Sequence, residues 1–266
     1  THLIFSTDNF VVGAVLGTAA VASYQVALGP SSALQSAGNQ FDVVSLTAAA
    51  SLRAQDATED LRRLLLEATR VVAAVAMPGV VMFAVWGRQL LALWVGRSFQ
   101  TSYWTLVVLS IGYLFATLTG AASQVMLALN RYKVIALVST GEAAINLILS
   151  ILLARRIGII GVALGTTIPL TVMAFCVYIP FACRLIGLSY ARLLRRLILP
   201  TAVNAVAFGI LRLVAGGSHL FSNLIVLIGA CVGVFAVCFS ASFLLDKNER
   251  STYMDMLRHL ALKGRT

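Results

Sequence analysis

Three acidic side chains, Asp8, Asp42 and Glu142, lie within apolar stretches of the sequence. Glu142 and Asn146 are four residues apart, so in a helix they share one face. Together they offer oxygens to a small cation, or a carboxylate that takes up a proton. Asp42 follows the two amide side chains of "SAGNQFDVV". Carboxylates with amide neighbours indicate a polar, wet cavity among helices, where charge inside a membrane normally faces.

Each carboxylate also has a structural interpretation. Asp8 could cap a helix, Asp42 could lie in a bend or pair with a basic residue, and Glu142 could be a protonated residue that hydrogen-bonds a neighbouring helix. Glu142 lies nine residues past Lys133, roughly 13 Å along a helix and therefore close to the middle of a bilayer. A carboxylate there costs on the order of 3 kcal/mol to insert, which favours a functional role.

The composition predicts that helices embedded in a membrane position these residues. Of 266 residues, 59% are hydrophobic and only 11% are charged, and the mean hydropathy is +0.91. Soluble domains carry roughly 25% charged residues. The apolar runs are long and continuous, which is typical of helices and not of a barrel. The chain is therefore expected to be an all-α membrane protein, a polytopic helical bundle. Its net charge of +10 is interpreted as topology and contact with membrane lipids, with no nucleic-acid binding.

The apolar runs predict eight spans and leave no loop large enough for an extramembrane active site, so no enzymatic activity is expected. Three quarters of the 20 Lys and Arg residues fall in alternate connections and in the tail, which predicts a multi-pass protein with a cytoplasmic C-terminus. Trp86, Trp94 and Trp104 are expected at the opposite, external interface. The expected spans are approximately 2–17, 21–50, 64–86, 102–128, 134–154, 158–183, 193–214 and 220–245.

Two further patterns have open interpretations. Arg63, Glu67 and Arg70 are spaced for ion pairing at a helix start, and Arg70, the deepest, could instead contact an anionic headgroup. Gly-xxx-Gly spacing occurs in "GAVLG", "GVALG" and "GACVG", which permits close helix packing but indicates no particular function. The first apolar run begins close to Thr1, which suggests the C-terminal part of a longer polypeptide.

Four segments in order resemble a known family. They are "TDNFVVGAVLGTAAVASYQVA", "LLALWVGRSFQTSYWTLVVLS", "MLALNRYKV" and "NLILSILLARRIGIIGVALGTTI". In the first, an aspartate precedes a small-residue turn and a tyrosine, here Asp8, Leu16, Gly17, Tyr24 and Ala27. In the last, the matching positions are Asn146, Gly158, Gly161 and Ala163. The set resembles the polysaccharide transporter (Wzx-type) flippases of the multidrug/oligosaccharidyl-lipid/polysaccharide exporter superfamily.

The resemblance implies the C-terminal lobe of a two-lobed, V-shaped exporter fold. Residues 1–183 would form helices seven to twelve of the family, with the first one truncated. Residues 184–245 would add two transmembrane helices, and residues 246–266 a cytoplasmic tail. The site would draw on helices seven, eleven and twelve, which carry the candidate residues for coupling to Na⁺ or H⁺: Asp8, Glu142, Asn146, Thr166 and Thr167.

The implied function is a flippase of the bacterial inner (plasma) membrane that translocates undecaprenyl-diphosphate-linked oligosaccharide by alternating access for surface polysaccharide biosynthesis. Arg70 and Asp42 are the candidates for substrate binding. No cofactor is expected apart from the coupling ion. Partners would be the lipid-linked oligosaccharide, membrane lipids and a polysaccharide polymerase machinery. Two alternatives stay open: a cation-coupled multidrug exporter, and a non-transporting scaffold of polysaccharide assembly.

Overall fold

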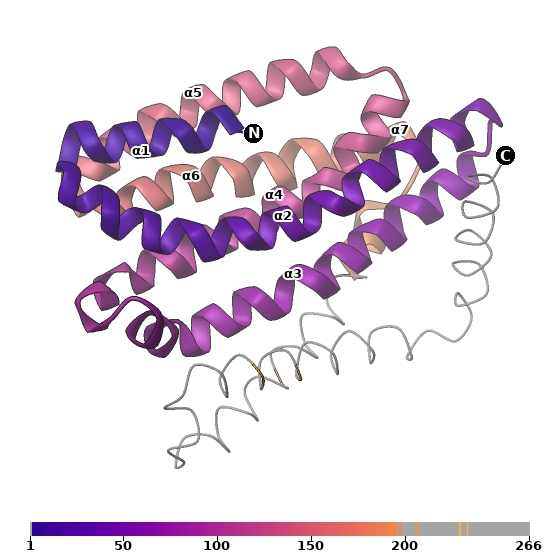
Figure 1. The fold of residues 1–266 in the computed structure, drawn as a ribbon. Helices are drawn as coiled ribbons and strands as arrows, with labels where there is room; N and C mark the ends of the chain where they lie inside the picture. Colours follow the sequence, from indigo (N-terminus) through magenta and orange to yellow (C-terminus); the bar gives the residue numbers. More distant parts are fainter. Residues whose placement is uncertain (1, 196, 198–205, 207–228, 230–232, 234–266) are drawn as a thin grey trace, which may run out of the picture.

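The described part of the chain is a bundle of helices in a computed structural model that describes residues 2–195, 197, 206, 229 and 233. Every element assigned within these residues is helical, and the long helices lie roughly along one common direction (Figure 1). The elements are α1 (His2–Leu16), α2 (Thr18–Ala54), α3 (Thr58–Trp94), the 3₁₀ helix η1 (Arg97–Ser102), α4 (Tyr103–Ala128), α5 (Tyr132–Ile157), α6 (Ile159–Met173), the π-helical turn η2 (Ala174–Tyr178) and α7 (Ile179–Leu185).

Four described segments are long and apolar enough to cross a membrane: Thr58–Trp94, Arg97–Ala128, Tyr132–Ile157 and Ile159–Leu185. The chain is therefore a helical membrane protein, as predicted. The first two expected spans are also helical, but α1 contains only a shorter apolar helix, Thr7–Leu16, and α2 is not among the four. The expected spans 193–214 and 220–245 and the tail 246–266 lie largely or wholly outside the described residues.

Two single-residue breaks fold the chain back on itself at the same end of the bundle. Gly17 separates α1 from α2 with φ +90°, and Gly158 separates α5 from α6 with φ +66°. Both angles lie in the region that residues with a Cβ rarely adopt, which explains glycine at each position. The two tight hairpins set α1 against α2 and α5 against α6. They bring the polar residues of α1, α5 and α6 into one region.

Two apolar clusters fill the interior, and α4 contributes to both. One contains Leu65, Leu118 and Ile179 from α3, α4 and α7, and the other contains Tyr24, Leu106 and Val162 from α2, α4 and α6. Burial of such side chains stabilises a helix bundle, and the central position of α4 makes it the common support.

The prediction for the three tryptophans needs one correction. Trp94 and Trp104 are both 53% exposed, as expected of interfacial residues, but Trp86 is 1% exposed. The reason is that α3 continues eight residues beyond Trp86 to Trp94. Trp86 is therefore two turns inside the helix and belongs to the core.

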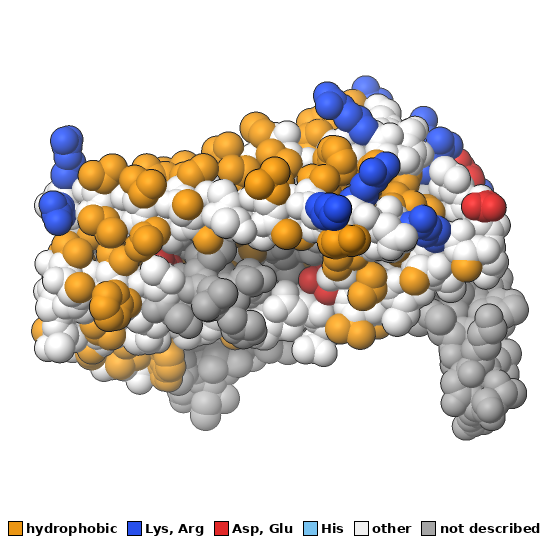
Figure 2. All heavy atoms as spheres, turned by 90° about the horizontal axis from the view of Figure 1, so that it is seen from above, with side chains coloured by type: hydrophobic (Ala, Val, Ile, Leu, Met, Phe, Trp, Pro, Cys, Tyr) orange, Lys and Arg blue, Asp and Glu red, His pale blue; other side chains and the backbone are white. Residues whose placement is uncertain are grey.

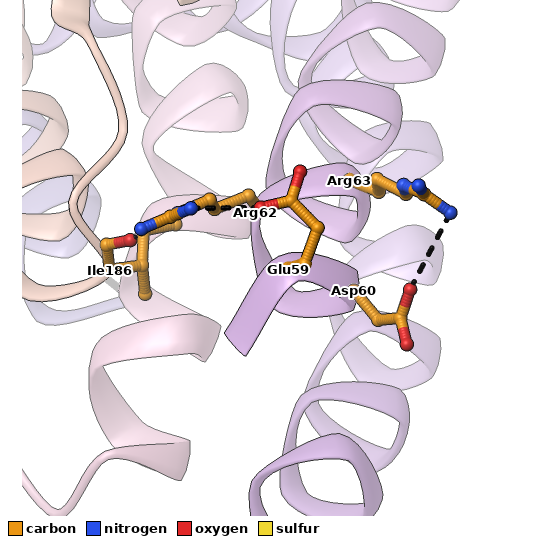
Figure 3. A network of polar contacts seen from close by, with 5 residues as sticks. All are labelled: Glu59, Asp60, Arg62, Arg63 and Ile186. Carbon is orange, nitrogen blue, oxygen red and sulfur yellow. Dashed lines mark hydrogen bonds and ion pairs between the residues drawn. The ribbon is translucent and has the colours of Figure 1, made fainter. Parts of the chain in front are cut away.

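Arginines at the ends of α2 and α3 hold neighbouring helix ends in place. Arg53 donates to the Ala128 carbonyl at the end of α4 over 2.6 Å, and Arg62 donates to the Ile186 carbonyl, just past α7, also over 2.6 Å. Arg62 pairs with Glu59 at 2.8 Å as well (Figure 3). A cation is favourable at a helix C-terminus, where carbonyls lack partners. These basic residues therefore have a structural role in addition to their effect on topology.

The distribution of charge in space is that of a bundle that crosses a membrane. In Figure 2 the Lys and Arg side chains gather at the two ends of the visible face, more of them at one end, and hydrophobic side chains form a band between them. This is the pattern expected of a bundle whose middle contacts lipid.

We expect a cysteine at Gln100 to react with an impermeant thiol reagent added outside intact cells, because η1 lies in the predicted external connection. Cysteines at Lys133 and at Lys247 should react only after permeabilisation. The measurement is labelling in a background without the four native cysteines. Labelling of either lysine position in intact cells would contradict the topology.

Candidate functional site

Asp8 is the centre of a buried polar site. Its side chain is fully buried, and its Oδ2 atom accepts hydrogen bonds from the Thr166 hydroxyl at 2.7 Å and the Tyr24 hydroxyl at 3.0 Å. Tyr24 and Thr166 are also buried, at 0% and 1% exposed. Tyr113 of α4 lies within electrostatic range of the same carboxylate. One carboxylate thus connects α1, α2 and α6 in the interior of the bundle.

The site continues from α6 to α5 through one backbone carbonyl. The Val162 carbonyl accepts the Thr166 hydroxyl at 3.2 Å and the Ser150 hydroxyl at 3.4 Å. Ser150 lies one turn from Asn146 on the only buried face of α5. Hydrogen bonds thus join Asp8, Thr166, the Val162 carbonyl and Ser150 across three helices. These groups, together with Asn146 one turn from Ser150, are called here the Asp8 site.

Two atoms of the Asp8 site are buried without a hydrogen bond to any described residue: Oδ1 of Asp8 and Nδ2 of Asn146. Buried polar atoms normally have partners, because an unsatisfied one costs about 1–3 kcal/mol. Carboxylate, amide, hydroxyl and carbonyl oxygens are the ligands that hard cations prefer. Within the described residues no group of three His, Cys, Asp or Glu side chains could hold a metal ion. A single carboxylate among neutral oxygens fits one monovalent cation or one proton.

Close packing of α5 on α6 brings the two halves of the Asp8 site together. A Cβ atom at Gly165 would overlap the backbone of Ser150, and one at Gly161 would overlap the backbone at Leu153 and Ala154. The glycines of "GVALG" therefore let the backbones approach, as Gly-xxx-Gly pairs permit in membranes. The pattern, which indicated no function in the sequence, positions Ser150 against Val162.

Glu142 lies on the same buried face of α5 but away from Asp8. It is 6% exposed and two turns, about 12 Å, along α5 from Ser150. Tyr178 of η2 lies within electrostatic range of its carboxylate. Thr167 points elsewhere, since its hydroxyl donates to the Val108 carbonyl of α4 at 2.9 Å. Among the predicted coupling residues, the structure thus brings Asp8 and Thr166 into contact, and places Asn146 one turn from Ser150 on the buried face of α5.

The two predicted substrate-binding residues occupy different surroundings. Arg70 is 9% exposed and pairs with Glu67 of its own helix at 3.8 Å. Asp42 is half-buried and lies over Gly120 of α4. An anionic headgroup would reach Arg70 only by competing with Glu67.

The exposed surface of α2 carries more polar side chains along its length than that of α5. On α2 the exposed polar residues, called here the α2 polar face, are Gln25, Ser36, Asn39, Gln40 and Thr47. Val43 and Val44 are also exposed on α2, at 68% and 52%. On α5 the exposed residues include Leu137, Ile148 and Leu152, at 76%, 58% and 57%. Leucine and isoleucine suit lipid, whereas amide side chains require water or a polar partner. The polar side chains of α2 therefore need water or a polar partner, which the exposed leucines and isoleucines of α5 do not.

Sequence reasoning missed three contributors to the site. Tyr24 was part of the family-like segment but had no role assigned, and Ser150 had none either. The signal for Ser150 was its position four residues after Asn146, on the same face. The carbonyl of Val162 carries no sequence signal, because every residue has one.

Comparisons with known proteins agree with this architecture. Residues 1–104 match the family model described as "Polysaccharide biosynthesis protein". The fold is similar to a solved structure titled "Lipid II flippase MurJ, inward closed conformation", with a TM-score of 0.67 and 16% sequence identity over 92% of this chain. The chain spans about half, 52%, of that flippase. No match was found among curated protein sequences. The family match and the fold agree with the resemblance, and the fold confirms the predicted fold class, an all-α helical membrane protein.

Proposed function

We propose that this chain forms half of a flippase that moves an oligosaccharide linked to undecaprenyl diphosphate across the bacterial inner membrane by alternating access. The match to a polysaccharide biosynthesis family and the flippase-like fold support the translocation of a lipid-linked substrate in general. The sugar-bearing substrate, the coupling ion and the absence of covalent chemistry are part of the proposal.

The α2 polar face is the observation that carries it. A 37-residue helix with amides and hydroxyls on an exposed face is poorly suited to lipid. It suits the wall of a hydrated path through which sugar hydroxyls pass, because irregular and polar surfaces at membrane depth line cavities. The apolar exposed side of α5 then contacts lipid, and the lipid tail of the substrate can remain in the bilayer.

The Asp8 site supplies the ion side of the proposal. A cation or proton bound there would neutralise the carboxylate, and its release would change the relative stability of the inward- and outward-open states. Only interactions that differ between the two states shift such an equilibrium. Asp8 meets this requirement because it connects three helices that alternating access would move relative to one another.

The test is complementation of a bacterial strain that lacks its polysaccharide flippase, using this chain with its native adjoining sequence. Restored surface polysaccharide is expected. Drug resistance without polysaccharide would favour a multidrug exporter, and normal accumulation with neither activity would favour a scaffold.

A matched pair of substitutions tests the α2 polar face. Thr47 and Thr140 are both exposed, and each donates its hydroxyl to a carbonyl of its own helix. We expect Thr47→Leu to lower polysaccharide export by up to about tenfold, the equivalent of one lost hydrogen bond. Thr140→Leu on the lipid-facing side should have no effect. Equal effects of the two would contradict the assignment of the two faces.

A further inference from the structure

We propose that Tyr24 is the positioning residue through which the Asp8 site controls α2. The inference rests on the proposed function and adds the element that links ion binding to the substrate path. It starts from one observation: the Tyr24 hydroxyl donates to Oδ2 of Asp8 at 3.0 Å, with both side chains fully buried.

The geometry makes this contact the polar link between the ion-binding carboxylate and α2. Asp8 lies nine residues before Gly17 and Tyr24 lies seven residues after it, so the two face each other across the α1–α2 hairpin. Apolar contacts of the same hairpin, such as Gly13 against Val21, do not depend on the charge of Asp8. A change at the carboxylate is therefore transmitted to α2 through the Tyr24 hydroxyl.

The two carboxylate oxygens of Asp8 accept different numbers of hydrogen bonds. Oδ2 accepts both Tyr24 and Thr166, while Oδ1 accepts none from the described residues. The two donors thus orient the carboxylate and leave Oδ1 for the ion. A bound cation withdraws negative charge from the carboxylate and weakens the hydrogen bond to Oδ2, since bonds to a full charge are the stronger ones. Ion occupancy consequently sets how firmly α2 is held to α1.

The other side of α2 faces the proposed path. Gln25, next to Tyr24 in the sequence, begins the α2 polar face, which continues through Ser36 to Thr47. Pro30 lies inside α2 between Tyr24 and Ser36 and donates no backbone hydrogen bond, but α2 continues through it as one helix, which carries a displacement at Tyr24 to the α2 polar face. Loosening the Tyr24–Asp8 contact therefore shifts the surface along which the sugar would move, and ion binding and substrate movement become two effects of one contact.

The experiment separates ion binding from the movement of α2. A single cysteine at Ser36, in a background without the native cysteines, reports exposure of the α2 polar face by its labelling rate in NaCl and in choline chloride. Thermal unfolding of the same detergent-purified protein in the two salts reports Na⁺ binding. In the parent protein we expect Na⁺ to raise the midpoint and to change the labelling rate by at least about fivefold, the lower range of typical coupling between sites.

In Tyr24→Phe, the Na⁺-dependent rise in midpoint should persist because the remaining ligands stay in place, while the labelling rate should no longer respond to Na⁺. Tyr103→Phe is the matched control: it removes one tyrosine hydroxyl, which donates to the Ala84 carbonyl at 2.7 Å in the external part, and should behave as the parent. The inference is overturned if the labelling rate of Tyr24→Phe responds to Na⁺ as that of the parent does. It is also overturned if Na⁺ changes neither the labelling rate nor the unfolding midpoint of the parent.

Failure of complementation with these responses intact would count against the proposed function alone. The two proposals can therefore fail separately.

Discussion

Asp8→Asn is expected to abolish export of surface polysaccharide while the protein inserts and accumulates as the parent does. Asparagine has nearly the same shape as aspartate, and its carbonyl oxygen can still accept the Tyr24 and Thr166 hydroxyls. It lacks the charge that an ion requires. Loss of a group that only supports a metal ligand already costs about 10- to 100-fold in affinity, and loss of a charged ligand should cost at least as much.

Two measurements test this: complementation, and the midpoint of thermal unfolding of the purified variant in NaCl and in choline chloride. The midpoint should be the same in the two salts. Glu142→Gln is the informative comparison, because Glu142 is buried on the same face of α5 but two turns from Ser150. If Glu142 is a second coupling group, its variant also fails to complement; if it only hydrogen-bonds a neighbouring helix, glutamine serves almost as well. Normal export by Asp8→Asn would contradict the role of the Asp8 site.

Hydropathy was sufficient to predict the helical membrane fold, because the described apolar runs all became helices. The lower hydropathy of α2 also indicated a helix of a different kind. The stretch from Thr18 to Ala54 mixes apolar residues with serine, glutamine and asparagine, and in the structure both amide types and some hydroxyls are exposed, whereas Ser31 and Ser45 are buried. The weak hydropathy of α2 reflects a helix with polar side chains on its exposed surface. Counting spans does not distinguish such a helix from one that is surrounded by lipid.

The contacts within the site could not be predicted from the sequence, because they join residues that are far apart along the chain. Asp8 and Thr166 are 158 residues apart, and only the resemblance to a family placed them in one site. Periodicity could place Glu142, Asn146 and Ser150 on one face, but not which of them lies level with Asp8. The tight break at Gly17 did contain usable information, since a hairpin with its turn there brings Tyr24 opposite Asp8.

The arginines of the predicted cytoplasmic connections show a similar limit. Their number and alternation predicted an orientation, yet Arg53 and Arg62 also donate to carbonyls at or just beyond the ends of α4 and α7. Which carbonyl each reaches depends on how helices 75 and 124 residues away pack. Topology and stability therefore use the same side chains, and substitution of either arginine would change both.

Gly165→Ala is expected to destabilise the protein, whereas Gly141→Ala is not. The new Cβ atom would overlap the backbone and side chain of Ser150, so rotation of a side chain cannot relieve the overlap. Overpacking costs about 1–3 kcal/mol when neighbours can adjust, and a backbone contact should place this case at the upper end. The measurement is the thermal midpoint of the purified protein and its accumulation in the membrane.

Gly141→Ala is the matched control, since a Cβ atom there meets nothing within 4 Å. Alanine is the better helix former by up to about 1 kcal/mol, so this variant should be as stable as the parent or slightly more stable. The two variants also differ in their effect on the Asp8 site. Moving α6 away from α5 separates the Val162 carbonyl from the Ser150 hydroxyl, now 3.4 Å apart, so surviving Gly165→Ala protein should bind Na⁺ more weakly. Parent-like stability and Na⁺ response in Gly165→Ala would contradict the close packing of these helices and, with it, the joining of α5 to the Asp8 site.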